Sequence, residues 1–334
     1  MSNFRVLILI LLLGMFSLMG CSQHLPSETS EAKEILEVTV SILPQKYFVE
    51  RIGGDTVNVN VMVKPGANPA TYEPKPEQLR ALSNTQAYLT IGVPFEKAWL
   101  PRIASVNSKM IFVDTTESIP LQPIANHHHH HGEEEQHHEE EENLDPHIWL
   151  SPKLVKIQAQ IIKDALVELE PENKTEYQAN LESFLADIDQ LDAEIRKRLQ
   201  GIKNHKFMVF HPSWGYFARD YGLEMIAIEI GGTEPSASEL AKLISEAKEE
   251  NIKIIFAQPE FNTESAETIA KEIGGEVLLI SPLAPDWLNN LRQVAKKFSE
   301  VLKSQSNVLQ VKDDLLGAIP DLFSYPSSDK VHYG

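Results

Sequence analysis

Short apolar runs alternate with helix-spaced segments along most of the chain. In the first half, segment 36–43 is rich in β-branched residues, and segment 57–63 places valine at every second position, first between asparagines, as a half-buried strand does. The second half repeats this alternation. The expected strands are 36–43, 57–63, 87–91, 110–113, 206–210, 225–230, 252–257 and 276–280, and the expected helices are 45–52, 75–82, 95–105, 215–221, 236–251, 265–273 and 287–304. Strands that alternate with helices predict two α/β lobes, each with a parallel sheet covered by helices on both faces.

A long helix is expected between the two lobes. Ser151 and Pro152 begin a helix that Pro171 stops, and segment 173–199 then carries apolar residues at helical spacing. A helix of about 27 residues is roughly 40 Å long, which suits a rigid strut. The predicted organisation is an N-terminal α/β lobe over 38–170, a linking helix over 171–202 and a C-terminal α/β lobe over 203–334.

The N-terminus reads as an export signal. Arg5 precedes an apolar run from Val6 to Met19, and these fourteen residues are fewer than the roughly 20 that span a bilayer. Leu-Met-Gly-Cys at 18–21 resembles a bacterial lipobox, which predicts a signal peptide over 1–20, a lipidated Cys21 and a tether over 21–37. The protein is then held by lipid on the outer side of the cytoplasmic membrane, in the periplasm of a Gram-negative cell. The alternative is a membrane-anchoring helix with an incidental cysteine.

Composition narrows the possible partners and metal ligands. The 334 residues carry 30 Lys and Arg against 48 Asp and Glu, a net charge of −18, which disfavours nucleic-acid binding. Cys21 is the single cysteine, so an intramolecular disulfide and a multi-thiolate metal site are excluded. Any metal site must use histidine, carboxylate or backbone oxygen.

An insert over 127–142 holds seven histidines and seven glutamates in sixteen residues. Such a segment cannot form a core, but it can hold divalent cations loosely at several places. The histidines are His127, His128, His129, His130, His131, His137 and His138. Without its seven glutamates the net charge falls from −18 to about −11, so much of the acidity is a local, cation-attracting loop. The alternative is a solvated acidic loop without a role in metal binding.

Two histidines lie at junctions where ligands collect in open α/β folds. His147 stands in Asp-Pro-His-Ile-Trp-Leu-Ser-Pro, just before a proline-initiated helix, and His211 directly follows the expected strand 206–210. One imidazole from each lobe predicts a metal site in the cleft between them, since imidazole is a common zinc ligand. Each histidine taken alone is also compatible with a purely structural role.

A hydrolase is the enzymatic alternative. Ser213 lies between strand and helix in a sequence that differs from the nucleophile elbow G-x-S-x-G only at its first glycine. The glycine that is absent here is the one that permits the strained turn of the elbow. His332 is the only histidine after Ser213 in the sequence. We therefore expect no enzymatic activity.

The order of features resembles the metal-binding solute-binding proteins of ABC importers, in the ZnuA-like zinc-uptake branch, over residues 37–302. The segments that carry the resemblance are Asp145–Pro152 and Gly215–Leu223, with a lipobox, a His-rich insert and a long helix in the family's order. The resemblance implies two Rossmann-like lobes with parallel sheets, a long rigid helix joining them and a metal cleft between them. It also implies that the protein passes zinc to the importer's permease, and we expect the protein to be a monomer. His147 and His211 match two family ligands, and histidine at 211 favours zinc over manganese.

Two positions depart from the family's pattern. Ala70 stands where the family usually has a histidine, and Ser281 stands where many members have an aspartate. Because zinc prefers four ligands, the missing ones must come from water, from the insert or from nearby carboxylates. We expect Glu260 to be the best replacement, since it follows a strand, with Glu73 as a further candidate. The alternative is a zinc buffer or sensor that uses the His/Glu-rich insert and has a degenerate cleft.

Overall fold

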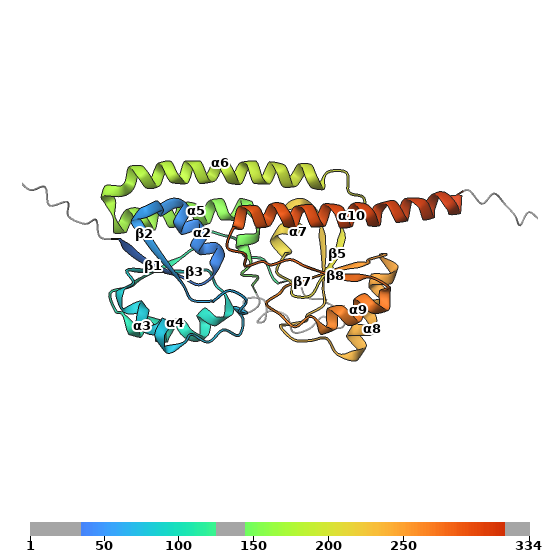
Figure 1. Ribbon diagram of the computed structural model, residues 1–334, viewed down its shortest axis with the longest axis horizontal. Helices are drawn as coiled ribbons and strands as arrows, with labels where there is room; N and C mark the ends of the chain where they lie inside the picture. The colour runs from blue at the N-terminus through green and yellow to red at the C-terminus, as the bar shows by residue number, and fades with distance from the viewer. Residues whose placement is uncertain (1–34, 125–143, 318–334) are drawn as a thin grey trace, which may run out of the picture. The chain divides into compact units, whose positions relative to one another are not determined.

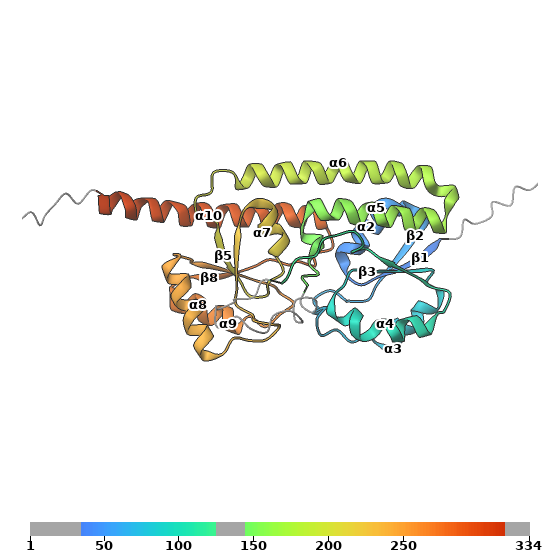
Figure 2. The ribbon, with the colours of Figure 1, turned by 180° about the vertical axis from the view of Figure 1, so that it is seen from behind.

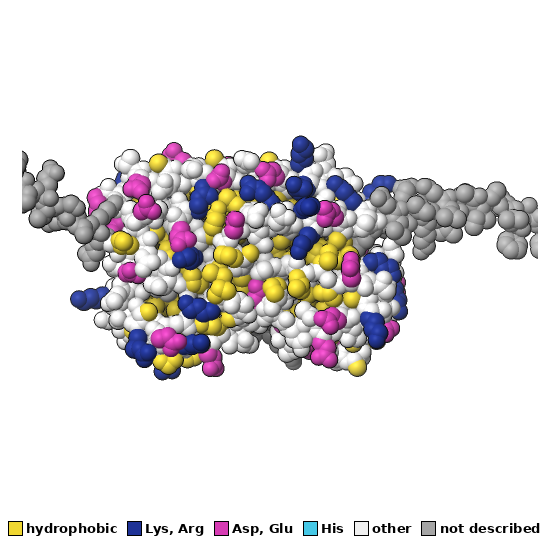
Figure 3. Space-filling model, viewed as in Figure 1, with side chains coloured by type: hydrophobic (Ala, Val, Ile, Leu, Met, Phe, Trp, Pro, Cys, Tyr) yellow, Lys and Arg dark blue, Asp and Glu magenta, His cyan; other side chains and the backbone are white. Residues whose placement is uncertain are grey.

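The computed structural model describes residues 35–124 and 144–317, with side chains to residue 304. The expected signal peptide, Cys21 and the seven histidines of the insert lie outside the described residues. Within the described part of the chain, no helix is both long enough and apolar enough to cross a membrane. On the face shown in Figure 3, acidic and basic side chains are interspersed.

The N-terminal lobe is a parallel four-stranded sheet in the order β2-β1-β3-β4. Val38 and Val40 of the inner strand β1 are fully buried because helices cover both faces of the sheet. Figures 1 and 2 show α2 and α5 on one side and α3 and α4 on the other. The strands are β1 (Leu36–Val40), β2 (Val57–Val61), β3 (Ala87–Thr90) and β4 (Ile111–Asp114), and the helices are α2 (Leu43–Gly53), α3 (Pro76–Ala81), α4 (Pro94–Val106) and α5 (Pro152–Leu169).

The C-terminal lobe repeats this topology with the strand order β6-β5-β7-β8, again parallel throughout. In both lobes the chain moves to one side of the first strand and then to the other, so each sheet has a switch point beside that strand. Ligands of open α/β sheets bind outside the carboxyl ends of the strands at such points. The strands are β5 (Lys206–Val209), β6 (Glu224–Ala227), β7 (Ile254–Ala257) and β8 (Glu276–Leu279), and the helices are α7 (Gly215–Tyr221), α8 (Ala237–Glu249) and α9 (Glu264–Ile273).

Two long helices, α6 (Lys174–Leu199) and α10 (Trp287–Gly317), pack against each other along the lobes (Figure 1). The α6 helix also packs on α2 and α5 of the N-terminal lobe. Trp287 at the start of α10 makes an edge contact with Phe48 of that lobe at 5.2 Å, whereas Phe298 stacks on Phe217 of the C-terminal lobe at 5.5 Å. The sequence predicted one linking helix, and the structure shows that α10 also reaches both lobes.

The predicted two-lobe α/β fold is confirmed. Every predicted strand and helix is present, and most ends differ by a few residues, whereas the last helix, predicted to end at 304, continues to Gly317 as α10. The Ser151 hydroxyl accepts a hydrogen bond from the Leu154 N–H and so caps α5, at the start that Ser-Pro predicts. Four short 3₁₀ turns complete the described elements: η1 (Gly54–Thr56), η2 (Leu82–Asn84), η3 (Ile148–Leu150) and η4 (Pro171–Asn173).

Candidate metal centre

His211 and Glu229 lie side by side because they follow neighbouring strands at the same distance. Val209 ends β5 opposite Ala227, the end of β6, and each side chain of the pair comes two residues later. The backbone ladder continues beyond the strands, since the Glu229 N–H donates to the Phe210 carbonyl at 2.9 Å. The His211 Nδ1 lies 2.6 Å from the Glu229 Oε2, so the carboxylate accepts the ring N–H and directs the Nε2 lone pair away from itself.

His147 is held by a second carboxylate in the same manner. One oxygen of the fully buried Asp145 accepts from the His147 backbone N–H at 2.9 Å and contacts the His147 Nδ1 at 2.6 Å. Asp145 is itself anchored, because its N–H donates to the Gln122 carbonyl and its carbonyl accepts from the Tyr216 hydroxyl at 2.8 Å. The His147 Nε2 is therefore also presented as a lone pair.

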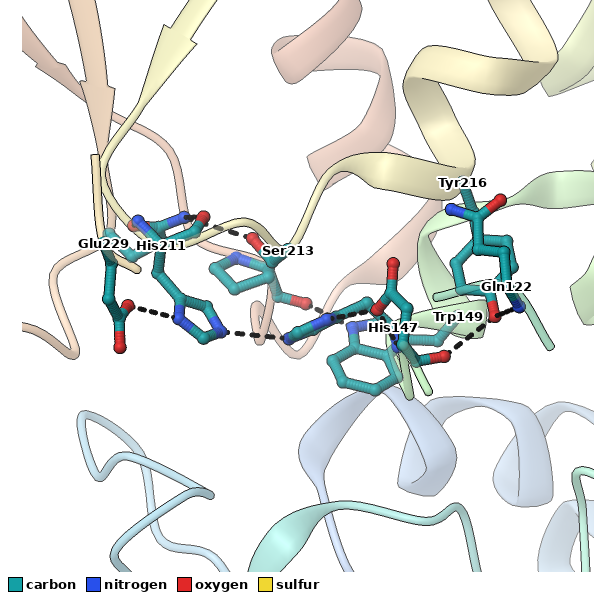
Figure 4. Close-up of polar contacts among 10 residues, drawn as sticks. Gln122, His147, Trp149, His211, Ser213, Tyr216 and Glu229 are labelled. Carbon is teal, nitrogen blue, oxygen red and sulfur yellow. Dashed lines mark hydrogen bonds and ion pairs between the residues drawn. The ribbon is translucent and has the colours of Figure 1, made fainter. Parts of the chain in front are cut away.

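The two Nε2 atoms face each other at 3.3 Å (Figure 4). With both Nδ1 atoms donating to carboxylates, neither Nε2 carries a proton to donate, so the pair favours a cation between the rings. Tetrahedral zinc with Zn–N bonds of about 2.0–2.1 Å separates two nitrogen ligands by about 3.3 Å. The spacing of the two imidazoles therefore fits one bound metal ion.

The surroundings of His211 favour its neutral form. Burial lowers the pKa of His211, and the nearby His147 lowers it further, although hydrogen bonding to Glu229 acts in the opposite direction. Phe261 stacks on the imidazole with ring centroids 4.3 Å apart. The side-chain amide of the buried Gln258 clamps the His211 backbone, accepting from its N–H at 3.2 Å and donating to its carbonyl at 2.7 Å. A neutral and rigid imidazole is what metal ligation requires.

The His147 segment is tied to the opposite lobe by Trp149. The Trp149 ring lies 5.1 Å from the His147 ring, and its Nε1 donates to the Pro282 carbonyl at 2.8 Å. The Trp149 carbonyl in turn accepts from the Trp287 Nε1 at 2.6 Å. These buried contacts fix the His147 segment against residues that follow strand β8 of the C-terminal lobe.

Both histidines line a cleft of about 590 Å³. Its opposite wall, from the N-terminal lobe, includes Ala70, Thr71 and Lys97. Within residues 35–124 and 144–304, no group of three or more His, Cys, Asp or Glu side chains converges on a metal-sized site. The described chain therefore supplies two strong ligands to this cleft.

The structure does not bring Glu260 to the two histidines. Glu260 lines a second pocket of about 270 Å³, which shares Leu283 with the cleft, and its Oε1 accepts from the Ser281 hydroxyl at 2.6 Å. Burial raises the pKa of Glu260, and its buried Oε2 has no hydrogen-bond partner among the described residues. Glu73 is exposed and does not line the cleft with the histidines. Neither carboxylate candidate joins the two imidazoles in a metal-sized group among the described residues.

Ser213 has no access to a substrate. Its side chain is fully buried, and its hydroxyl accepts a hydrogen bond from the Gln258 amide at 3.1 Å. The Ser213 hydrolase has no support in the structure, because the hydroxyl is held inside the protein rather than exposed at an elbow.

Three positioning residues were not singled out from the sequence: Asp145, Glu229 and Gln258. Asp145 had a local signal, since an aspartate two residues before a histidine can bond both its backbone and its ring. Glu229 had a weaker one, since it stands two residues beyond the end of a strand as His211 does. For Gln258, position after a strand did not indicate which neighbour its amide would clamp.

Comparison with known proteins identifies the family of the chain. The family described as zinc-uptake complex component A, periplasmic (ZnuA) matches residues 38–301. The high-affinity zinc uptake system protein ZnuA of Bacillus subtilis is 28% identical over 309 residues, covering 89% of this chain and 93% of its own. A crystal structure of ZnuA is 46% identical with a TM-score of 0.74, covering 80% of this chain and 100% of that chain. A zinc-bound ZnuA deletion mutant is also 46% identical with a TM-score of 0.73, covering 80% of this chain and 98% of that chain.

Fold, paired histidines and family match lead to one conclusion. The chain belongs to the ZnuA family of zinc-uptake components, and it is a zinc-binding solute-binding protein of ABC import rather than an enzyme.

Proposed function

We propose that the protein captures zinc between His147 and His211 and presents it to the permease of an ABC importer. The observation that carries this proposal is the 3.3 Å separation of the two Nε2 atoms, each imidazole being held from behind by a carboxylate. Such carboxylate–histidine–metal arrangements orient the ring and raise its basicity. The B. subtilis relative is named for high-affinity zinc uptake, and one similar structure holds zinc, which supports zinc as the cargo.

The site is tested by zinc titration of the mature protein, with a chromophoric chelator as competitor. We expect one tight zinc per chain, lost in His147→Ala and in His211→Ala. His205→Ala is the matched control, because His205 is exposed and its Nδ1 contacts the Gly222 carbonyl outside the cleft. Tight binding that survives both cleft substitutions would overturn the proposed site.

The insert over 127–142 is proposed to add weak, multiple zinc sites beside the cleft. Ile124 and Leu144, the described residues on either side of the undescribed segment, both line the cleft. Deletion of 127–142 should remove the weak phase of the titration and leave the tight one. If the deletion removes all zinc binding, the alternative of a loop-based buffer or sensor replaces the cleft as the function.

Export, anchoring and assembly state complete the proposal. We infer cleavage before Cys21, a lipid on that cysteine, and a monomer tethered outside the cytoplasmic membrane. Labelling cells with a palmitate analogue should mark the wild-type protein and leave Cys21→Ser unmarked. An unlabelled wild-type protein that stays in the membrane fraction would favour the anchoring-helix alternative. Light scattering of the mature chain should give the mass of one copy.

A further inference from the structure

Two coordination positions of a zinc ion held by His147 and His211 have no ligand from the described part of the cleft. The facing wall contributes Asn68, Ala70, Thr71 and Lys97. Among these only Asn68 and Thr71 carry neutral oxygens, and the Asn68 Oδ1 already accepts from the Ala70 N–H at 2.8 Å. Zinc sites with three or fewer protein ligands take the remaining ones from solvent or substrate.

The carboxylates that line the cleft are already engaged. Glu229 holds His211, and Glu234 accepts a hydrogen bond from the Ser265 hydroxyl. Glu260 accepts from the Ser281 hydroxyl in a neighbouring pocket that shares Leu283 with the cleft. The cleft that the two histidines line also includes Lys97.

Lys97 gives that wall a positive charge. It is an exposed residue in the first turns of α4, and its ammonium makes no ion pair or hydrogen bond within the described residues. A lysine facing a bare divalent cation is repulsive, whereas the same lysine attracts a metal ligand that carries a carboxylate. A cleft of about 590 Å³ also lies within the range of pockets that hold small molecules.

We propose that the cargo is zinc together with a small bidentate amino-carboxylate ligand of the amino-acid class. This inference rests on the proposed function, since it places the zinc on the same two histidines. The ligand's amine nitrogen and one carboxylate oxygen complete four-coordination with the two Nε2 atoms. The second carboxylate oxygen faces Lys97, and two metal-bound waters are released. As the nitrogen binds zinc, the ammonium group of the free amino acid gives one proton to solvent, and no other bond in the ligand is made or broken.

Glycine is the simplest probe of this class. Zinc is titrated into the mature protein with and without millimolar glycine, and free zinc is corrected for the amount that glycine holds in solution. We expect glycine to raise the corrected zinc affinity of the wild-type protein. Lys97→Gln should lower that gain by up to about five-fold, the scale of a partly exposed charge pair, and Lys97→Arg should keep it. Methylamine, which has no carboxylate, should give no gain.

The controls separate this inference from the proposed function. The glycine gain should persist when 127–142 is deleted, because His147, His211 and Lys97 all lie outside the insert. If glycine leaves the corrected zinc affinity unchanged or lowers it, the amino-carboxylate cargo is overturned. The same holds if the glycine gain disappears with the deletion. Both results leave zinc capture intact. Loss of the proposed function itself would be seen separately, as zinc binding that His147→Ala does not change in either buffer.

Discussion

Glu229→Gln isolates the contribution of the carboxylate behind His211. The substitution removes one negative charge but keeps an oxygen that can accept the Nδ1–H, now 2.6 Å from Glu229, in a pair whose side chains are 13% and 9% exposed. The imidazole should therefore stay in place, and the change in zinc affinity should report the lost charge rather than a lost fold.

The magnitude follows from the distance to the metal. The bond of 2.6 Å, the width of the ring and a Zn–N bond of about 2.0 Å place the carboxylate about 6–7 Å from the zinc. For charges of −1 and +2 at this distance, Coulomb's law gives about 1 kcal/mol in water and about 5 kcal/mol at an effective dielectric of 20. Carboxylates behind metal-bound histidines are typically worth about 10- to 100-fold in metal affinity, or about 1.4–2.7 kcal/mol, which lies between those limits.

The assay is competitive zinc titration of wild type, Glu229→Gln and Glu234→Gln. Glu234 is the matched control, since it is a carboxylate of the same cleft that bonds Ser265 instead of a histidine. We expect a loss of about 10- to 100-fold for Glu229→Gln and a several-fold smaller loss for Glu234→Gln. Equal losses in the two variants would show that zinc affinity depends on the total negative charge of the cleft. They would refute the positioning role of Glu229.

The pH dependence provides a second check on the cause. Burial already lowers the pKa of His211, and Glu229 raises it more than Asp145 does, so removing the Glu229 charge lowers that pKa further. Proton competition at His211 is then weaker in the variant, and it cannot explain a loss of zinc affinity. The loss should therefore be fully present at pH 8, above the ordinary histidine pKa of about 6.5.

Three further predictions concern stability and the cleft wall. Trp287→Ala should lower the free energy of unfolding by about 3–5 kcal/mol in urea titrations, because the buried indole packs on Phe48 at 5.2 Å; a cost below about 1 kcal/mol would contradict this packing role. Burial raises the pKa of Glu96 from 4.5 to about 7, so the folded state holds its proton more tightly and the free energy of unfolding should fall by about 3 kcal/mol as pH rises from about 4.5 to about 7. Glu96→Gln should flatten this window, and an unchanged pH profile would show that another group causes it. Ala70→His adds an imidazole to the cleft that the two histidines line and should raise zinc affinity by about tenfold or more in the same competitive titration; an unchanged affinity would show that position 70 does not reach the metal.

Local patterns in the sequence were sufficient for the fold and for the imidazole pair. The alternation of strand and helix periodicity is a property of neighbouring residues, so it predicted all eight strands and the long helix α6. His147 and His211 were predictable because each stands at an element boundary, where parallel α/β topology gathers side chains at one edge of the sheet. The role of α10 was not predictable in this way, because the contacts of Trp287 and Phe298 with different lobes depend on how the lobes are placed.

What tertiary structure alone decided is the direction of each side chain at that edge. Position after strand β7 predicted that Glu260 would reach the cleft, yet it is Gln258, two residues earlier, that contacts His211 across the β5–β7 edge. Glu260 instead bonds Ser281, which follows the neighbouring strand β8. A strand end places a residue at the rim of a sheet, but the choice between two adjacent strands depends on the path of the following loop. Long-range packing sets that path, and no local pattern of residues encodes it.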